Sequence, residues 1–526
     1  MKISRLNFIA LLSLFFVLFY NGTFFIKVST VYPLTWNNIG FLVSLGVVLM
    51  GVITILLLLT THRYTLKPIA IALLMISSFT SYFMQTYNVI LDKTMIQNTM
   101  ETNLNESLDL LTWKLLGYVV FLGLLPSWVV YRTTIDYKSF KGEFLATLKG
   151  IMVIVGISGV LLFSFSKHYT SFFRENKSLR FYTNPTYYLY STGKYIYEMY
   201  FTHQATLQPF GRDAKRMPSD TKRLTIVVVG EAARANRFSL NGYERKTNPL
   251  LEKEAIINFS EVSSCGTSTA ISVPCMFSHL ERQNYSDKVA KNTENVIDIV
   301  KHAGIDVLWR DNNSDSKGVA LRVKYEDFRT PQKNTICDEE CRDEGMLVGL
   351  QEYVDAQKSD VLIVLHQMGN HGPAYYKRYP KAFEHFNPTC QTNQVEKCTT
   401  EEIGNAYDNA ILYTDYFLSK TIAFLKANDK HYETALIYMA DHGESLGEKG
   451  LYLHGIPYFM APDEQTHVGA LMWFGEKARA RIDTEALRQN AGEKYSHDNL
   501  FHTILGLVGV ETAVYDKSKD ILLYHK

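Results

Sequence analysis

The amino-acid sequence predicts an α-helical membrane domain of five transmembrane helices, followed by an α/β domain with a mainly parallel central sheet. Long uncharged apolar runs are confined to the chain before about Lys167, and such runs are typical of membrane-spanning helices. After about Arg212, short β-branched runs alternate with longer amphipathic segments, which is the pattern of a parallel sheet covered by helices.

The composition of the 526 residues excludes two classes of protein. Lys and Arg total 54 and Asp and Glu total 53, so the net charge of +1 lacks the basic surplus of a nucleic-acid-binding protein, and we expect no nucleic acid partner. Hydrophobic residues make up 47% and charged residues 20%, which is too apolar for a disordered chain. The length also indicates more than one domain.

Five segments of the first half are long and apolar enough to cross a bilayer, which takes roughly 17–25 residues. They are Leu6–Ile26, Ile39–Thr60, Pro68–Leu91, Leu115–Tyr131 and Gly150–Ser166. Buried core helices of a soluble protein are the alternative, but so many apolar runs in succession are hard to hide inside one globule. We find no convincing cleavage site after the first segment and expect it to be a retained anchor.

The charges of the connecting loops predict the orientation of the helices, because cytoplasmic loops carry an excess of Lys and Arg. Basic residues lie before the first segment, between the second and third segments, and between the fourth and fifth. They are Lys2, Arg5, His62, Arg63, Lys67, Arg132, Lys138, Lys141 and Lys149. The loop from Asp92 to Lys114 is acidic on balance and is expected outside. An odd number of spans then places everything after Lys167 on the outer side.

All six cysteines lie in the second half of the chain, which suits an exported domain with disulfide bonds. The spacing favours pairs of neighbours, namely Cys265–Cys275, Cys337–Cys341 and Cys390–Cys398. A zinc site is the alternative for the last four cysteines, but no CxxC spacing is present.

An aromatic segment, Tyr169–Arg212, joins the two halves. Its many Tyr and Phe residues with interspersed Lys and Arg suit the headgroup layer of a bilayer, although packing on the outer domain would also explain them. We expect an interfacial linker. The predicted division is therefore a transmembrane domain at 1–168, the linker at 169–212 and an outer α/β domain at 213–526.

The predicted strands of the outer domain end in residues that bind metals. These strands are Leu224–Val229, Ile305–Trp309, Val361–Leu365, Ala435–Met439 and Val468–Phe474. Glu231 follows the first, His366 and His371 follow the third, and Asp441 with His442 follows the fourth. Because ligands bind beyond the carboxyl ends of parallel strands, these side chains should converge on a metal ion. Mixed carboxylate and imidazole donors suit zinc, with manganese as the alternative.

A nucleophile is expected in the hydroxyl-rich run Ser264-Cys265-Gly266-Thr267-Ser268-Thr269-Ala270. A helix should begin near this run, and a hydroxyl at a helix N-terminus faces backbone N–H groups that can hold an anion. A metal ion would lower the pKa of such a hydroxyl. The run also fits a plain N-cap, and composition does not choose among Thr267, Ser268 and Thr269.

Four runs of the sequence have to be considered together. They are Gly230-Glu231-Ala232-Ala233-Arg234, Asn241-Gly242-Tyr243-Glu244-Arg245, the hydroxyl-rich run with Val273-Pro274-Cys275-Met276-Phe277, and Ala440-Asp441-His442-Gly443-Glu444-Ser445. In combination they resemble the membrane-bound phosphoethanolamine transferases of Gram-negative bacteria, in particular the lipid A-modifying type that includes the mobile colistin-resistance enzymes. The resemblance covers essentially the whole chain and implies an alkaline phosphatase/sulfatase-like fold for the outer domain.

For the active site, the resemblance implies Thr269 as the nucleophile and one tightly bound zinc ion on Glu231, Thr269, Asp441 and His442. His371 and His454 match positions that bind a second, weaker metal or the phosphoethanolamine group, and either histidine is a candidate proton donor. The positions that match substrate-binding residues of the family are Asn98, Thr102, Glu106, Lys317, His371 and His454.

The resemblance further implies an enzyme of the bacterial inner membrane with its catalytic domain in the periplasm. It would move phosphoethanolamine from phosphatidylethanolamine to a phosphate of lipid A through a phospho-threonine intermediate, and we expect it to be a monomer. The alternatives are transfer to core sugars of lipopolysaccharide, and a phosphoglycerol transferase of the same fold. A sulfatase would need Cys or Ser followed by x-Pro-x-Arg, which neither Cys265 nor Cys275 offers. A transporter is disfavoured because the spans lack buried charges.

Overall fold

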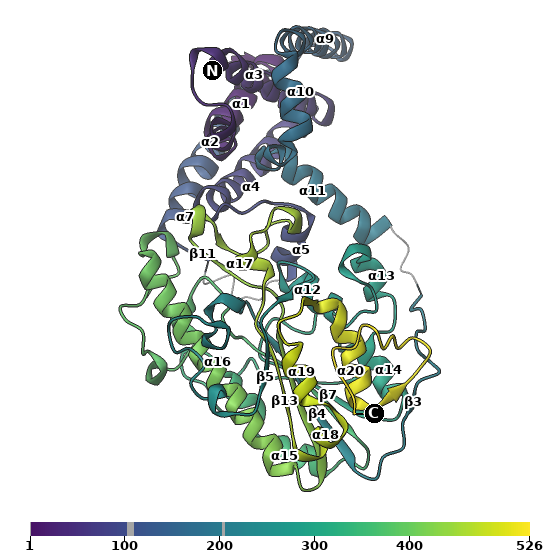
Figure 1. The fold of residues 1–526 in the computed structure, drawn as a ribbon. Helices are drawn as coiled ribbons and strands as arrows, with labels where there is room; N and C mark the ends of the chain where they lie inside the picture. Colours follow the sequence, from purple (N-terminus) through teal and green to yellow (C-terminus); the bar gives the residue numbers. More distant parts are fainter. Residues whose placement is uncertain (1, 102–109, 202–205, 526) are drawn as a thin grey trace. The chain divides into compact units, whose positions relative to one another are not determined.

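The computed structural model describes residues 2–101, 110–201 and 206–525, and it contains two compact units (Figure 1). The helical unit comprises Met1–Ile96 with Leu111–Phe201, and the α/β unit comprises Gln97–Leu110 with Thr202–Lys526. Residues Gln97 to Glu101, the end of the helix α5 (Lys93–Glu101), therefore belong to the α/β unit, although they lie between apolar helices in the sequence.

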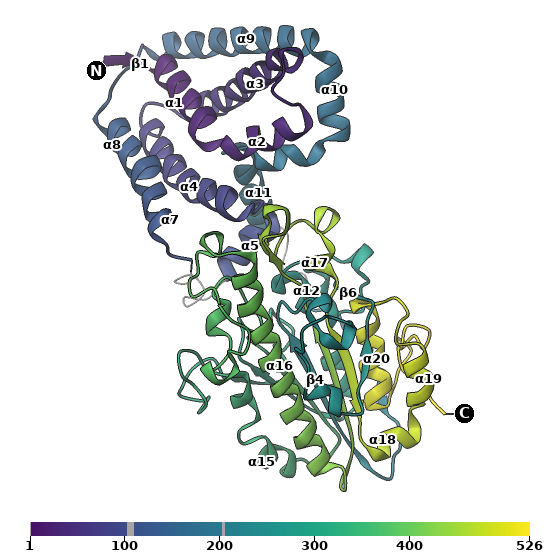
Figure 2. The ribbon, with the colours of Figure 1, turned by 60° about the vertical axis from the view of Figure 1, so that its left-hand side comes forward.

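The helical unit contains the apolar helices that the sequence predicts (Figure 2). They are α1 (Arg5–Tyr20), α2 (Gly22–Val31), α3 (Trp36–Thr60), α4 (Leu66–Tyr87), α7 (Trp113–Tyr118), the π-helical turn η1 (Val119–Leu124), α8 (Leu125–Arg132) and α9 (Phe140–Ser164). Among the described helices, α3, α4, α9 and the continuous stretch Trp113–Arg132 can each span a membrane by length and composition. The pair α1 and α2 makes a fifth span if it is counted as one, so the predicted helical membrane region is confirmed in this form.

The first predicted span is not one straight helix, because α1 and α2 meet at an angle of 63°. The break falls at Asn21-Gly22, and glycine pairs with small polar residues are common sites of helix kinks. The buried Asn21 side chain donates through Nδ2 to the freed carbonyl of Phe16 at 2.9 Å and to the carbonyl of Asn184 at 2.6 Å. Its Oδ1 accepts a hydrogen bond from the Asn184 backbone N–H at 2.8 Å. The bend is therefore stabilised by bonds that a hydropathy pattern does not reveal.

Helix α9 begins at Phe140 rather than near the predicted Gly150. Ser139 caps it by accepting a hydrogen bond from the Gly142 N–H at 3.3 Å, and Glu143 lies in the first turn, where a negative charge is favourable. The extra turns carry Lys141 and Lys149, so they fall outside any search for uncharged runs.

The aromatic segment forms helical structure within the helical unit up to Phe201, with α10 (Ser166–Glu175), the 3-10 helix η2 (Lys177–Tyr182) and α11 (Thr186–Ile196). Several of its polar atoms bond to the apolar helices. Tyr169 Oη lies 3.1 Å from Ser44 Oγ on α3, and Tyr188 Oη lies 3.2 Å from Ser77 Oγ on α4. Part of the aromatic content of this segment thus serves packing against α3 and α4.

The α/β unit is built on a seven-stranded sheet in the order β5-β13-β10-β4-β9-β7-β8. Its strands are β4 (Lys222–Gly230), β5 (Ile257–Phe259), β7 (Asp306–Asp311), β8 (Lys324–Asp327), β9 (Val361–His366), β10 (Tyr432–Ala440) and β13 (Ala470–Phe474). The strands from β10 to β8 pair in parallel, whereas β13 runs antiparallel to β10 and β5 antiparallel to β13. The predicted mainly parallel sheet is confirmed, and the two short edge strands β5 and β8 are additions to it.

Helices cover both faces of this sheet (Figures 1 and 2). The long helix α16 (Thr400–Asn428) lies on one face, and α14 (Val296–His302) and α20 (Leu500–Val508) lie on the other. All residues of β9 and β10 are buried as a result. Burial on two faces explains why the central strands read as continuous apolar runs rather than as alternating ones.

The bond network of Asn21 predicts a specific loss of stability in the helical unit. Replacing Asn21 by Ala removes its three hydrogen bonds and leaves the buried groups of Asn184 unpaired, at a cost of about 1–3 kcal/mol for each unsatisfied group. The melting temperature of the detergent-solubilised protein should fall clearly. Asn38→Ala is the control, because Asn38 is only partly buried and its side chain makes one hydrogen bond among the described residues, to the Pro33 carbonyl. Equal melting temperatures for the two variants would contradict a role of Asn21 in holding the bend.

Candidate active site

The carboxyl ends of three adjacent strands carry polar residues that the sequence singles out, but the expectation that His366 joins the others is wrong, because its Nδ1 lies 2.9 Å from Asp311 Oδ2 instead. Glu231 directly follows β4, His366 is the last residue of β9, and Asp441 directly follows β10. The register aligns Gly230 of β4 with Ala440 of β10 and Val229 with His366. Because neighbouring parallel strands end at the same edge, Glu231 and Asp441 are placed side by side by the sheet itself.

Four buried side chains form a compact cluster at this edge, which we call the strand-end cluster: Glu231, Thr269, Asp441 and His442. Thr269 Oγ1 donates to Glu231 Oε2 at 3.1 Å and lies 3.3 Å from His442 Nε2. The same His442 Nε2 lies 3.4 Å from Glu231 Oε1 and 3.5 Å from Asp441 Oδ2. All four residues predicted to hold a metal are therefore brought together.

The geometry distinguishes Thr269 from its hydroxyl-bearing neighbour Thr267. Helix α12 (Thr269–Met276) begins at Thr269, whose hydroxyl points into the strand-end cluster. Thr267 instead donates its hydroxyl to the carbonyl of Ile456 at 2.7 Å. The turn before α12 is held tightly, since the Gly266 N–H donates to Ser272 Oγ at 3.0 Å and the disulfide Cys265–Cys275 joins the turn to the helix.

The strand-end cluster fits a divalent cation. Glu231 Oε1 and Asp441 Oδ2 are buried and have no hydrogen-bond partner among the described residues, while Asn313 and the backbone bond the other oxygen of each carboxylate. Burial, together with the nearby Asp441 carboxylate, raises the pKa of Glu231 well above its usual value. A cation between the two carboxylates would offset both effects.

His442 is set up to act as a neutral ligand. Burial lowers its pKa, which favours the uncharged imidazole that metal binding requires. Its Nδ1 lies 2.8 Å from the Gly443 carbonyl, so Nδ1 carries the proton and Nε2 offers its lone pair to the cluster. Two carboxylates, one imidazole and one hydroxyl make a mixed oxygen and nitrogen donor set of the kind that zinc accepts.

A second group of polar side chains lies next to the strand-end cluster. The ring of His454 lies 4.3 Å from that of His442 and 5.9 Å from that of His371, measured between centroids. His454 Nδ1 lies 3.0 Å from Glu444 Oε2, and Tyr375 donates its hydroxyl to Glu444 Oε1 at 3.0 Å. His442, Glu444 and His454 are close enough to hold an ion as a second set of ligands. Burial lowers the pKa of His371, and the Arg378 charge lowers it further.

The loop after β7 brings Asn313 and Lys317 to this region. Asn313 Nδ2 donates to Glu231 Oε2 and to the Gln367 carbonyl, both at 2.7 Å. Lys317, which is buried, donates through Nζ to the Ser314 carbonyl at 2.9 Å.

Of the predicted substrate-binding residues before the aromatic segment, only Asn98 is described by the structure. It lies on α5 (Lys93–Glu101), whereas Thr102 and Glu106 lie outside the described residues. Glu101 at the end of α5, which the sequence analysis did not single out, pairs with Lys291 at 3.5 Å and lies 4.0 Å from Lys317 Nζ. The end of α5 thus contacts the loop that carries Lys317.

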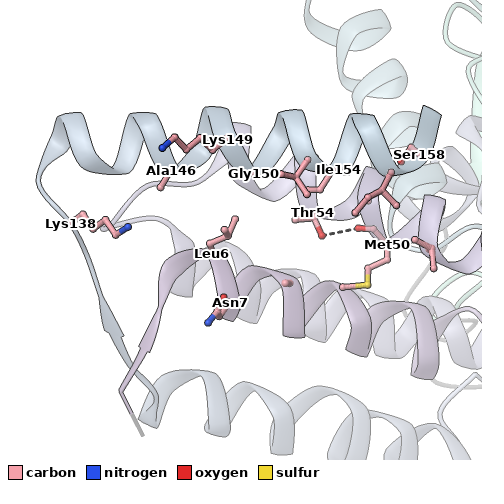
Figure 3. Close-up of a pocket in the computed structure, with 15 residues that line it drawn as sticks. Leu6, Asn7, Met50, Thr54, Lys138, Ala146, Lys149, Gly150, Ile154 and Ser158 are labelled. Atoms are coloured by element: carbon pink, nitrogen blue, oxygen red, sulfur yellow. Dashed lines mark hydrogen bonds between the residues drawn. The ribbon is translucent and has the colours of Figure 1, made fainter. Parts of the chain in front are cut away.

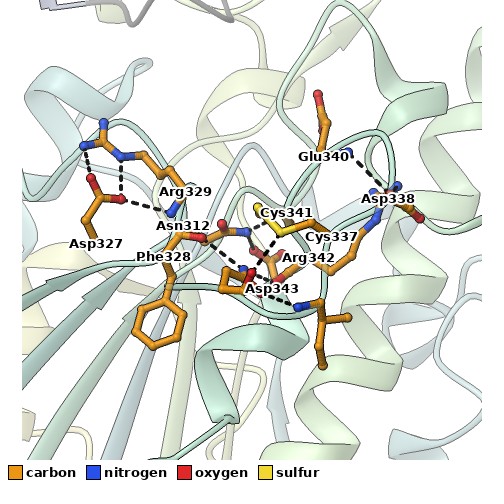
Figure 4. The surroundings of a disulfide bond; sticks show 12 residues. Asn312, Asp327, Phe328, Arg329, Cys337, Asp338, Glu340, Cys341, Arg342 and Asp343 are labelled. Carbon is orange, nitrogen blue, oxygen red and sulfur yellow. Dashed lines mark hydrogen bonds and ion pairs between the residues drawn. A yellow bond between two sulfur atoms is a disulfide. The ribbon is translucent and has the colours of Figure 1, made fainter. Parts of the chain in front are cut away.

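A disulfide-closed loop supports the ends of β7 and β9 (Figure 4). Asn312 donates through Nδ2 to the carbonyl of Cys341, in the Cys337–Cys341 pair, at 2.9 Å and to Asp343 Oδ1 at 2.8 Å. The Asp343 carboxylate also accepts the backbone N–H groups of Met368 at 2.8 Å and Gly369 at 3.1 Å. One carboxylate therefore fastens together the loops that follow both strands. The third pair, Cys390–Cys398, precedes α16, so the structure contains the three pairs that spacing favours.

His497, which the sequence does not single out, links two segments that carry residues of the strand-end cluster. Its Nδ1 accepts the Cys265 N–H at 3.0 Å, and its Nε2 donates to the Ala440 carbonyl at 2.9 Å. Burial lowers the pKa of His497 to about 4, so the neutral form that can make both bonds dominates at pH 7. It thereby connects the turn before Thr269 with the strand end before Asp441. Asn313 could have been found by extending the strand-end rule to β7, but no sequence signal points to His497.

Comparison with known proteins identifies first the structural class and then the family. The model of the sulfatase family matches residues 223–510, which include the strand-end cluster and the sheet except the first residue of β4, and this places the α/β unit in the alkaline phosphatase and sulfatase superfamily. A second family model, described as phosphoethanolamine transferase EptA/EptB, matches residues 49–200.

Relatives extend this likeness over the full chain. The chain is 42% identical to phosphatidylethanolamine transferase Mcr-1 of Escherichia coli, over 99% of this chain and 97% of that protein. It is 39% identical to phosphoethanolamine transferase EptA of Escherichia coli strain K12, over 99% and 98%. The solved integral membrane protein lipooligosaccharide phosphoethanolamine transferase A (EptA) from Neisseria meningitidis matches with a TM-score of 0.95 and 36% identity, covering 99% of this chain and 98% of that one. The chain therefore belongs to the phosphoethanolamine transferase family and is a membrane-bound phosphoethanolamine transferase.

The position of His497 predicts that it acts by holding Thr269 and Asp441 in register. His497→Ala should lower the turnover number about tenfold to a hundredfold, a range typical of residues that orient a metal site. His497→Gln should restore part of the rate, because an amide offers one acceptor and one donor. The control is His502→Ala, which removes another buried histidine of the same region, whose one side-chain hydrogen bond within the described parts of the chain is to the Asp516 N–H. Equal losses for His497→Ala and His502→Ala, at equal melting temperatures, would contradict the positioning role.

Proposed function

We propose that this transferase moves phosphoethanolamine from phosphatidylethanolamine to a phosphate of lipid A, through a phospho-threonine intermediate on Thr269. The observation that carries the proposal is the contact of Thr269 Oγ1 with Glu231 and His442, beside carboxylate oxygens that lack other partners. A hydroxyl in this position can lose its proton and attack phosphorus, whereas a hydroxyl that only capped a helix would bond to backbone N–H groups.

We further propose zinc as the cofactor, held by Glu231, Thr269, Asp441 and His442. A bound zinc ion would lower the pKa of the threonine hydroxyl and offset the negative charge that develops on the transferred phosphoryl group. The orphaned oxygens of Glu231 and Asp441 support a tight site. The group of His442, Glu444 and His454 supports a second, weaker one.

The residues of this chain have separate tasks in the proposed reaction. Thr269 Oγ1 forms the bond to phosphorus as the bond to the glycerol oxygen breaks, and diacylglycerol leaves once that oxygen gains a proton. His454, oriented by Glu444, is our candidate for the proton donor, with His371 as its neighbour. A phosphate oxygen of lipid A then attacks phosphorus and releases Thr269. Lys317, with Asn98, Thr102 and Glu106, is proposed to bind substrate; the family resemblance supports these four assignments.

The proposed location is the bacterial inner membrane, with the α/β unit in the periplasm. The basic loops that we assign to the cytoplasm and the three disulfides support this orientation. We propose that residues 1–168 form the membrane domain, 169–212 an interfacial linker and 213–526 the catalytic domain, and that the enzyme works as a monomer. Both substrates are membrane lipids, so a catalytic domain that stays tethered to the bilayer meets them without leaving the surface.

Lipid A mass spectrometry on cells that express the protein tests the reaction, the nucleophile and the acceptor together. We expect an added phosphoethanolamine group with the wild type, none with Thr269→Ala and a reduced amount with Thr269→Ser, which keeps a hydroxyl. Matched expression and melting temperatures are the control. Retained modification with Thr269→Ala would exclude the covalent mechanism. Modification found on core sugars instead would move the acceptor to the one used by the Escherichia coli Kdo(2)-lipid A phosphoethanolamine 7''-transferase, which is 25% identical to this chain.

The role of His454 can be separated from metal binding. If His454 donates a proton to the leaving group, His454→Gln should slow transfer from phosphatidylethanolamine about 10²–10⁴-fold but leave a nitrophenyl ester of phosphoethanolamine nearly unaffected, because nitrophenolate leaves without a proton. Zinc content should stay at the wild-type value. His467→Gln is the matched control, since His467 bonds to the Ser260 carbonyl away from the cluster. Equal slowing on both substrates would reject the proton-donor role, and a loss of zinc would assign His454 to the second metal site.

A further inference from the structure

The helical unit contains a pocket of about 530 Å³ between α1, α3 and α9, which we call the α9 groove (Figure 3). Its walls are mainly apolar, formed by residues such as Leu6, Val47, Met50, Val153 and Ile154. The groove is open rather than enclosed, and all of its lining belongs to the helical unit. It is therefore independent of the strand-end cluster and of the substrates proposed to bind there.

Small residues leave the space that the α9 groove occupies. Gly51 and Gly150 line it at points where the helices approach closely: a Cβ atom on Gly51 would lie 2.8 Å from Ile154 Cγ2, and one on Gly150 would lie 3.0 Å from Leu6 Cδ1. Ala10 and Ala146 line it as well. The helices therefore approach closely at the two glycines, and the groove beside them has room for an apolar chain.

Two lysines stand at one end of the α9 groove. Figure 3 shows Lys138 and Lys149 at the end where α9 begins, with Ala146 and Leu6 near them. Both side chains are exposed, and no ion pair of either is found among the described residues. An apolar trough that ends in two unpaired ammonium groups is complementary to a lipid with a negatively charged headgroup.

The neighbouring acidic residue, Glu143, accepts the Lys138 backbone N–H at 2.7 Å through Oε1, but among the described residues it forms no ion pair with the ammonium group of either lysine. Glu143 lies 3.5 Å from Arg5, whose guanidinium also donates to Thr147 Oγ1 at 2.9 Å and to the carbonyls of Leu58 at 3.0 Å and Thr61 at 2.6 Å. Glu143 is therefore paired with the buried Arg5. The charges of Lys138 and Lys149 remain available to a ligand.

The level of the lysines along α9 matches the headgroup region of a bilayer. Lys149 directly precedes the uncharged stretch that begins at Gly150, and the basic loops place this end of the helices on the cytoplasmic side. A lipid of the inner leaflet would set its phosphate beside Lys138 and Lys149 and lay an acyl chain along the apolar walls. Among the four described helical stretches that could each span a membrane alone, α9 is also the least packed, since none of its most apolar window is buried inside the protein.

We propose that the α9 groove is a binding site for one anionic glycerophospholipid of the cytoplasmic leaflet, of the phosphatidylglycerol or cardiolipin class, which helps to hold α9 against α1 and α3. The ligand is defined by a phosphodiester headgroup with net negative charge and by an acyl chain. A zwitterionic lipid lacks this net charge, because its own ammonium or choline group cancels the charge of its phosphate. That cationic group would also be repelled by the two lysines.

Native mass spectrometry and thermal unfolding of the full-length protein test this proposal. The protein is delipidated in detergent and then given phosphatidylglycerol, cardiolipin or phosphatidylcholine. The variants are Lys138→Gln with Lys149→Gln, and Lys138→Arg with Lys149→Arg. The control is Lys141→Gln, which removes an exposed lysine of the same helix that does not line the groove. Equal melting temperatures of all proteins without added lipid establish that the exchanges leave the fold intact.

We expect the wild type and Lys141→Gln to retain one anionic lipid and to gain thermal stability from it, with no such effect of phosphatidylcholine. The double Gln variant should bind the anionic lipid at least about tenfold more weakly, and the double Arg variant should bind like the wild type. The headgroup that binds more tightly, phosphatidylglycerol or cardiolipin, identifies the lipid class. Unchanged affinity in the double Gln variant, or equal binding of phosphatidylcholine, would overturn the proposal.

Discussion

Two buried carboxylates at the ends of neighbouring strands are the constraint around which the α/β unit is arranged. Glu231 and Asp441 are placed side by side by the register of β4 and β10, and a buried carboxylate without compensation is costly. Asn313 takes one oxygen of Glu231, and the Ala232 and His442 N–H groups take one oxygen of Asp441. The oxygens left over lie near His442, which is the arrangement expected of a site built for a cation.

The supports of this cluster come from parts of the chain that are far apart in sequence. Tyr407 on α16 accepts the Arg234 N–H at 3.0 Å and donates to the Ala232 carbonyl at 2.5 Å, which fixes the loop after β4. His497 fastens the turn before α12 to the end of β10, and Asp343 fastens the ends of β7 and β9. Tyr407 and His497 are neutral, and the Asp343 carboxylate is hydrogen-bonded. The net charge of the strand-end cluster therefore depends on the cluster's own residues.

The sequence was informative where one physical rule dominates. Burial on both faces makes the central strands continuous apolar runs, and the strand-end rule then located Glu231 and Asp441. Prediction from the sequence failed where several weak effects compete. The bend at Asn21 depends on bonds to a distant residue. The short edge strands β5 and β8 have no distinct hydropathy pattern. The choice of Thr269 among Thr267, Ser268 and Thr269 needed either family resemblance or the structure, since all three hydroxyls fit a helix start. The bridging role of His497 depends on tertiary contacts alone.

The proposed reaction depends on a zinc ion held by Glu231, Thr269, Asp441 and His442. Anomalous diffraction from crystals of the zinc-loaded protein, measured on both sides of the zinc absorption edge, tests it most directly. We predict one strong peak about 2.0–2.2 Å from carboxylate oxygens of Glu231 and Asp441 and from His442 Nε2, and a marked loss of that peak in crystals of Asp441→Asn. A peak confined to other residues, or the absence of any peak at the strand-end cluster with zinc in excess, would contradict the assignment.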